Sequence, residues 1–186
     1  MITFCRLRPV DAPTPSWAAA RRAEGSTVAE ITDATVETVA ACLEGGLLPV
    51  AVGSAAAGAA AWVVAPAGAH EAAAAGARGW QIAVVDEGPA EAVLDALVRT
   101  GAAFLRTGRS RVSQAAELAG LPGADAVVSV FVDDVEEAVA AVGAGAGDLL
   151  LRGWATERLG HLRDAMGGSL VERTAIPPGV DLDAAR

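Results

Sequence analysis

The chain has 186 residues, 53% of them hydrophobic, and a formal net charge of −9 at pH 7. This length suits one domain with a full core, and the apolar fraction excludes a disordered chain. Because phosphate binding needs clustered lysine and arginine, the acidic balance argues against a nucleic-acid partner.

Short apolar runs alternate with amphipathic segments along the chain. Strands are predicted near residues 3, 48, 63, 82, 104, 129, 150 and 171. Helices are predicted over residues 12–24, from a cap at Asp33, after Pro89, through Val112–Leu118, after the Asp133–Asp134 pair and over about 154–166. Apolar residues recur at helical spacing in these segments, which is typical of helices that bury one face.

A Gly-Ala step precedes a short apolar run five times, at residues 58, 76, 101, 123 and 145. From the second step onward the spacings are 25, 22 and 22 residues, about the length of one helix, one turn and one strand. Glycine readily takes the left-handed conformation that ends a helix, and a uniformly apolar strand must be covered on both faces. The repeat therefore predicts successive βα units and a parallel sheet.

These units predict a single α/β domain over residues 1–186, a compact (β/α)8-like TIM barrel or a partial barrel with parallel strands. The step of about 14 residues between the second and third predicted strands is too short for a full crossover helix. An open, doubly wound parallel sheet is therefore the alternative.

The sequence predicts a cytoplasmic protein with no membrane partner. Cys5 and Cys42 are too few for a disulfide scaffold, and the first residues lack the pattern of a signal peptide. Residues 46–69 carry no charge and could span a bilayer by length alone. They contain two prolines and mostly small residues, so two buried strands, LLPVAVG and AAWVVAP, explain them better.

In either architecture the functional site is expected where the parallel strands end. The polar residues expected at this edge are Arg6, Arg8, Ser54, His70, Asp86, Glu87, Arg106, Thr107, Arg109, Asp133, Asp134, Arg152, Glu157 and His161. Arginines together with carboxylates suit a small anionic substrate with an acid or base nearby. Arg6, Arg106 and Arg152 are the predicted substrate-binding residues. Helix caps also belong at strand ends, and Asp133 or Asp134 fits a cap better than a catalyst.

A hard cation such as Mg²⁺ prefers carboxylate ligands, and Asp86, Glu87, Asp133 and Asp134 could supply them. Their spacing is not diagnostic of a metal centre, so the sequence assigns no metal ligand.

The sequence contains no lysine, no asparagine and no tyrosine. Without lysine, no side chain can form a Schiff base with a carbonyl substrate or with pyridoxal phosphate. Cationic roles fall mainly to 14 arginines, which bind carboxylate or phosphate through paired hydrogen bonds but do not act as bases at neutral pH.

A stretch of about 127–161 includes VFVDDVEEAVAAVGAGAGDLLLRG and continues to His161. It resembles part of the FMN-dependent nitronate monooxygenase family, which is similar to the enoyl reductases of polyketide and fatty-acid systems. In that family a strand–helix–strand unit leads to a glycine-rich loop with a catalytic histidine. The resemblance implies an FMN cofactor, with Gly153 and Gly160 shaping the flavin pocket and His161 as the base. The alternative for His161 is a solvated helix residue.

A second segment, GAAAWVVAPAGAHEAAAAG, is similar to a strand and helix of the small barrel aldolases that cleave 2-keto-3-deoxy sugar-acid phosphates. Those enzymes use a lysine Schiff base, and this chain has no lysine. The resemblance therefore implies a related scaffold with a different mechanism.

Three functions follow from the sequence. The first is a small-molecule enzyme, an FMN-dependent monooxygenase or reductase that acts on a small anionic substrate. The second is a barrel without catalysis that serves as a structural or interaction partner of a larger biosynthetic enzyme. The third is a metal-assisted lyase or aldolase. The sequence leaves open whether the chain is an enzyme at all and whether it forms a homo-oligomer.

Overall fold

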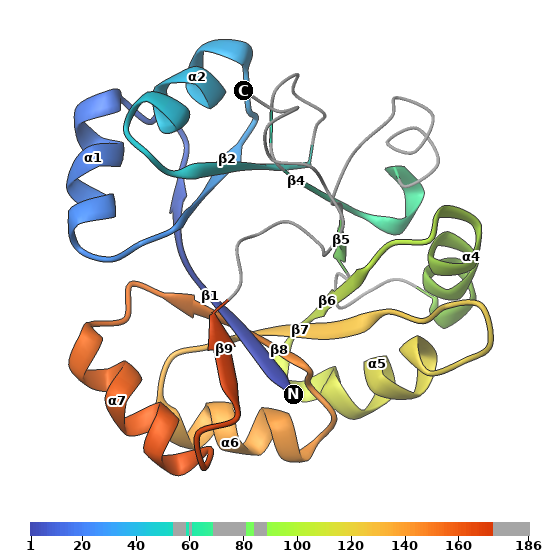
Figure 1. Ribbon diagram of the computed structural model, residues 1–186. Coiled ribbons are helices and arrows are strands. Elements are labelled where there is room, and N and C mark those ends of the chain that lie inside the picture. Colours follow the sequence, from blue (N-terminus) through green and yellow to red (C-terminus); the bar gives the residue numbers. More distant parts are fainter. Residues whose placement is uncertain (54–58, 60, 69–80, 84–88, 173–186) are drawn as a thin grey trace.

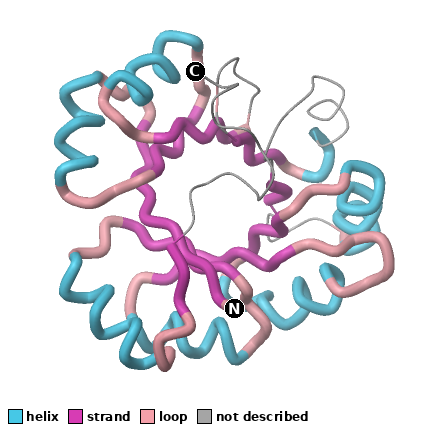
Figure 2. The backbone as a smooth tube through the Cα atoms, viewed as in Figure 1, coloured by secondary structure: helices cyan, strands magenta, loops and turns pink. Residues whose placement is uncertain are grey.

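The computed structural model describes residues 1–53, 59, 61–68, 81–83 and 89–172. Its strands form a central ring that is surrounded by helices (Figures 1 and 2). The strands are β1 (Ile2–Val10), β2 (Val28–Thr32), β3 (Leu48–Val52), β4 (Ala61–Val64), β5 (Gln81–Ala83), β6 (Phe104–Thr107), β7 (Val127–Val132), β8 (Asp148–Arg152) and β9 (Leu170–Glu172). The helices are α1 (Pro15–Ala23), α2 (Val36–Glu44), α4 (Ala90–Thr100), α5 (Val112–Ala119), α6 (Val135–Gly143) and α7 (Thr156–Ala165), with short 3₁₀ turns at Pro66–Gly68 and Arg109–Arg111.

Strand β1 closes the ring. The strands pair in parallel in the order β2 to β8 and then β1, and β1 pairs again with β2. Residues 3–7 of β1 pair with β8, and residues 7–10 pair with β2. Strand β9 adds to the beginning of β1, at residues 2–4. The predicted parallel βα barrel is confirmed, and the pairing of β1 with both β2 and β8 excludes the open sheet.

Alternation along each strand divides the buried residues into two clusters. The larger cluster lies between the outer face of the ring and the helices, and it includes Phe4, Ile31, Leu105 and Leu149. The smaller cluster fills the barrel interior and contains Cys5, Leu7, Val28, Val50, Val63 and Leu150. Because successive strand residues point to opposite faces, this division assigns each remaining strand side chain to the interior or to the exterior.

Small residues allow helices α1 and α2 to pack closely. A side chain at Gly45, which follows α2, would come within 2.3 Å of the Ala18 side chain and within 2.7 Å of the Pro15 carbonyl oxygen. Only glycine fits at this contact, so the abundance of small residues in the chain is partly a packing requirement.

Strand β2 was absent from the sequence prediction. Asp33, the predicted helix cap, lies in the turn after β2 with φ of 51°. Helix α2 begins instead after Thr35, whose hydroxyl oxygen accepts a hydrogen bond from the Thr38 backbone N–H. Within the described part of the chain, no helix is long and apolar enough to cross a membrane.

Candidate active site at the barrel mouth

A buried ion pair crosses the barrel interior. Glu30 on β2 and Arg106 on β6 point inward, because their neighbours Ile31 and Leu105 belong to the outer cluster. Nη2 of Arg106 lies 2.5 Å from Oε1 of Glu30, and the two side chains are only 10% and 7% exposed. Strands β2 and β6 are four places apart in an eight-membered ring, so the pair joins opposite walls.

Two arginines lie against one aromatic ring beside this pair. Cζ of Arg106 is 4.9 Å from the centroid of the Phe131 ring, and Cζ of Arg152 is 3.8 Å from it. The two guanidinium carbons are therefore no more than about 8.7 Å apart. Arg106, Phe131 and Arg152 lie at or next to the last residue of their strands, which places them at the C-terminal mouth. Contacts of this kind orient a guanidinium without neutralising it.

Arg152 is exposed and has no ion-pair partner among the described residues. The described charges of the interior are the pair, Arg152 and the fully buried Asp148. Oδ1 and Oδ2 of Asp148 accept hydrogen bonds of 2.7 Å from Thr3 and Ser129. Since Asp148 begins β8, this group lies at the opposite end of the barrel from Arg152, where it links three neighbouring strands.

The loops after β6, β7 and β8 are tied together around the mouth. Arg109 forms an ion pair with Glu137, and a Glu137 carboxylate oxygen also accepts the Asp133 backbone N–H at 2.8 Å. The Arg158 guanidinium donates to the Asp133 carbonyl oxygen at 3.1 Å, and the Trp154 indole donates to Val132 at 3.2 Å. Such links hold strand ends in fixed positions, which is what a binding site needs.

These contacts assign structural roles to several predicted rim residues. Asp134 is the N-cap of α6, and its carboxylate accepts the Glu137 backbone N–H at 2.8 Å. Arg109 and Asp133 belong to the loop contacts described above. The side chain of Thr107 lies on the outer face of β6, where it borders a cavity between α4 and α5.

Arg6 and Arg8 point outward from β1. The Nε of Arg6 donates to Glu172 of β9 at 2.8 Å, and Arg8 pairs with Glu24 at 3.3 Å. The predicted substrate-binding set is therefore divided, because Arg106 and Arg152 lie together at the mouth and Arg6 lies outside the ring. Gly153 follows β8 with φ of 62°, and a side chain there would collide with the Arg8 guanidinium at 2.4 Å.

His161 and Gly160 lie on helix α7, outside the ring. His161 is exposed and borders an open surface groove of about 450 Å³ that is also lined by Asp134, Glu136 and Arg158. A methyl group at Gly160 would meet no described atom within 4 Å. The catalytic role of His161 and the flavin role of Gly160 stay predictions, and the placement of both residues on an outer helix lends them no support.

The candidate metal ligands are only partly described. Ser54, His70, Asp86 and Glu87 lie outside the described residues. Within those residues, no group of three or more histidine, cysteine, aspartate or glutamate side chains could hold a metal ion. Because Asp134 already caps α6, a carboxylate metal centre does not fit what is described, and no step below passes through a metal.

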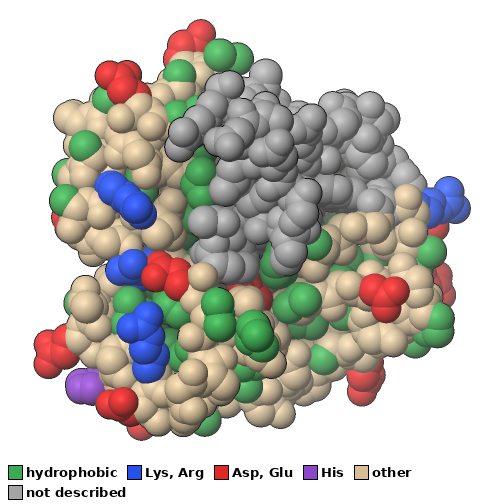
Figure 3. Space-filling model, in the orientation of Figure 1, with side chains coloured by type: hydrophobic (Ala, Val, Ile, Leu, Met, Phe, Trp, Pro, Cys, Tyr) green, Lys and Arg blue, Asp and Glu red, His purple; other side chains and the backbone are tan. Residues whose placement is uncertain are grey.

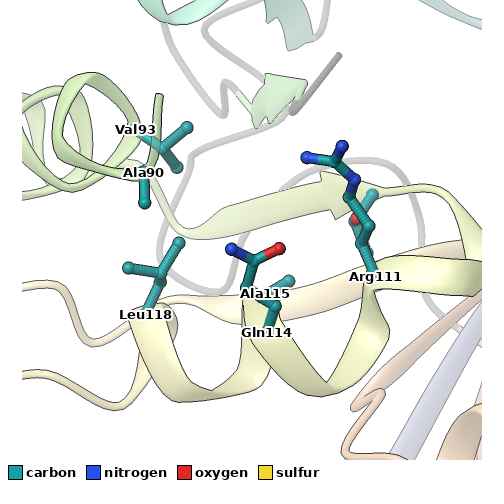
Figure 4. A pocket seen from close by; sticks show the side chains of 7 residues that line it. Ala90, Val93, Arg111, Gln114, Ala115 and Leu118 are labelled. Atoms are coloured by element: carbon teal, nitrogen blue, oxygen red, sulfur yellow. The ribbon is translucent and has the colours of Figure 1, made fainter. Parts of the chain in front are cut away.

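The cavity bordered by Thr107 is too small to hold a substrate. It has a volume of about 10 Å³, which is about the room for one water molecule. Ala90 and Val93 of α4 line one side, and Gln114 and Leu118 of α5 line the other (Figure 4). On the face shown in Figure 3, the acidic side chains of the described residues are scattered and form no continuous patch.

Glu30 and Phe131 are the site residues that sequence reasoning missed. The signal for Glu30 was one charged residue inside VAEIT, an otherwise apolar run between two helices. A charge in such a run must be paired when it is buried, but the sequence did not indicate which residue pairs with it.

The geometry defines a TIM-barrel fold with a charged mouth. No protein-family model matches the sequence, and no curated protein matches it. Among solved structures, the chain is similar to a variant of the citrate synthase SbnG, with a TM-score of 0.62, 12% identity, and 89% and 93% of the two chains covered. It is also similar to a native KDPGal structure (TM-score 0.57, 15% identity, 90% and 93% covered). A putative deoxyribose-phosphate aldolase from Coccidioides immitis matches with a TM-score of 0.56, 14% identity and 79% of each chain covered.

These neighbours correct the first resemblance. The resemblance to the FMN-dependent nitronate monooxygenase family is wrong, because the similar barrels include a citrate synthase, an aldolase and a putative aldolase. The short stretch of about 127–161 reflects a βα unit that many barrels share. FMN binding was expected only through that resemblance and stays an untested prediction. At identities of 12–15% the comparisons establish the fold alone.

Proposed function

We propose that the protein is a lyase or aldolase that breaks or forms a carbon–carbon bond in a small anionic substrate at the C-terminal mouth of the barrel. The observation that carries this proposal is the arrangement of Glu30, Arg106 and Arg152. One carboxylate and two guanidinium groups meet where barrels of this kind place their chemistry. The aldolase neighbours support the reaction class.

Each of the three side chains has a chemical task. The Arg152 guanidinium is exposed and binds the carboxylate or phosphate of the substrate. The Arg106 guanidinium, held in a poorly solvated interior, stabilises the negative oxygen of an enolate. Glu30 moves the proton.

In the cleavage direction, Glu30 takes the proton of the substrate hydroxyl group. The electrons of the O–H bond form a carbonyl group, the carbon–carbon bond breaks, and its electron pair passes into an enolate. Glu30 then returns the proton to the enolate carbon, so atoms and charge balance. A Schiff base on a side chain has no place in this scheme, since the chain has no lysine.

The proposal is tested with a panel of 4-hydroxy-2-oxo acids, with release of the free 2-oxo acid as the signal. We expect Arg152→Gln to raise KM by about tenfold or more, because one charged hydrogen-bonding contact contributes about 1.5–3 kcal/mol. Arg99→Gln is the matched control. Arg99 is an exposed arginine on α4 that pairs with Asp95, and its replacement leaves turnover unchanged.

Two results would contradict the proposal. Wild-type protein that cleaves none of these acids, with or without Mg²⁺, is not a lyase of this class. Equal loss of activity in Arg152→Gln and Arg99→Gln would show a general effect of charge rather than a site at the mouth.

A further inference from the structure

We propose that the substrate anion replaces Glu30 on the Arg106 guanidinium, so that binding itself frees Glu30 to act as the base. The inference rests on the function proposed above and describes how the same site is regulated. In the resting protein, Glu30 and Arg106 neutralise each other across the interior. While Glu30 contacts the Arg106 guanidinium, its carboxylate is turned to Arg106 and not to a substrate, so the pair is the inactive state of the site.

The geometry of the pair favours exchange. Although Oε1 of Glu30 is 2.5 Å from the Arg106 guanidinium, it accepts no well-aligned hydrogen bond from the described residues. The contact is therefore electrostatic rather than directional. A ligand carboxylate that approaches along the guanidinium edge can form two parallel hydrogen bonds, which are stronger.

The neighbouring groups favour the same exchange. Phe131 supports the Arg106 guanidinium from a ring that does not move with Glu30. Arg152 carries a positive charge on the same ring and has no ion-pair partner among the described residues, so it draws an anion to within reach of Arg106. An anion that contacts both guanidinium groups takes the place of Glu30.

Displacement leaves Glu30 as a buried carboxylate without a counter-ion, and because an unpaired buried charge is costly, we expect a proton to neutralise it in the complex. The described titratable or charged groups that share the interior with Glu30 are Cys5 on β1, Arg106 on β6, and Asp148 and Arg152 on β8. Asp148 lies at the far end of the barrel with two hydroxyl partners. With a substrate, the proton comes from its hydroxyl group, and with an unreactive anion it comes from water.

Isothermal titration calorimetry with oxalate tests the exchange, because oxalate is unreactive here and stays ionised between pH 6 and pH 8. For the wild-type protein we expect proton uptake on binding, seen as a heat that varies with the ionisation enthalpy of the buffer. The complex holds more protons than the free protein, so oxalate affinity rises as pH falls from 8 to 6. This measurement needs no variant.

Loss of a binding residue weakens ligand binding, whereas we expect the Glu30→Gln substitution to strengthen the binding of oxalate. We expect the variant to bind oxalate about tenfold more tightly at pH 8, because the internal competitor for Arg106 is gone. Its proton uptake and its pH dependence disappear, and so does turnover. The glutamine amide keeps the size of the side chain, and circular dichroism confirms that the variant is folded.

The outcomes separate this inference from the proposed function. Oxalate that binds through Arg152 without proton uptake, and no more tightly to Glu30→Gln than to wild type, overturns the exchange and leaves the proposed site intact. Oxalate that binds neither protein overturns both proposals.

Discussion

Glu30 and Arg106 are a pair whose members cannot be removed singly without cost. Arg106→Gln leaves the buried Glu30 carboxylate without its counter-ion, which costs about 3–5 kcal/mol of unfolding free energy. The double variant Glu30→Gln/Arg106→Gln removes both charges and recovers most of that loss. Urea unfolding monitored by circular dichroism measures all three proteins. A single variant as stable as the wild type would show that the pair does not form.

Cys42 on α2 gives a clean test of burial at high pH. The side chain is fully buried, and burial raises the pKa of the Cys42 thiol from an ordinary value of 9.0 to about 11. Between pH 9 and pH 11 the folded protein therefore keeps a proton that the unfolded chain has lost, so the unfolding free energy falls as pH rises. The chain has no lysine or tyrosine to obscure the effect.

The measurement for Cys42 is urea unfolding at pH 8, 9, 10 and 11. We expect a decline in wild type that is reduced in Cys42→Val, whose side chain is similar in size and does not titrate. Cys5→Val controls for the second buried thiol. Parallel curves for wild type and Cys42→Val would contradict the assignment.

At the scale of the helices, replacement of glycine by alanine is expected to change the stability of the protein in opposite directions at two positions. Gly45→Ala forces a methyl group against the backbone of α1, which has no room to move, and we expect a loss of about 1–3 kcal/mol or more. Gly160→Ala adds a methyl group in open space inside α7, and we expect a gain of about 0.5–1 kcal/mol. Thermal melts of the two variants give the comparison.

Gly160→Ala also separates the two roles considered for this residue. A helix position on the outer surface tolerates alanine without change in activity, whereas a glycine that shapes a ligand pocket does not. A loss of catalysis with unchanged stability would contradict the surface position described above.

The element pattern of the sequence predicted most of the fold, and one strand shows where it failed. The Gly-Ala repeat identified the βα units from residue 76 onward because each unit has nearly the same length. Strand β2 was missed because only VAEIT separates two helical segments and a charge interrupts its apolar pattern. The same omission hid Glu30, since a residue in an unrecognised strand cannot be assigned to the interior.

At the scale of the whole molecule, the candidate site depends on the order in which the strands pair in the ring. That order cannot be derived from the sequence. The strand ends correctly predicted that Arg106 and Arg152 lie together at the mouth, because parallel strands bring their ends together. Their role in substrate binding stays a prediction. Arg6 was misplaced because strand alternation turns it outward, where Glu172 of β9 meets it. The ion pair of Glu30 and Arg106 joins opposite walls of the barrel. It can be inferred only when the order of the strands in the closed ring is known.

The absence of lysine predicts a further result for the whole chain. Incubation with a cleavable 2-oxo acid and sodium borohydride attaches no 2-oxo acid to any side chain, because no side chain can form a reducible imine. The amino group of the exposed Met1 lies at the start of β1, at the opposite end of the barrel from the mouth. Formaldehyde with borohydride labels it as a positive control. An adduct of the 2-oxo acid located on a side chain by peptide mass spectrometry would overturn the proposed mechanism.

The double role of β1 has a consequence for how the protein is made. Thr3 meets Asp148 across 145 positions of sequence, so β1 leaves the ribosome long before β8 and cannot have both of its edges paired until β8 follows. Contacts this distant make folding slow and leave apolar edges open during synthesis. A nascent chain halted before β8 therefore cannot complete the ring, and it should depend on chaperones more than the finished protein does.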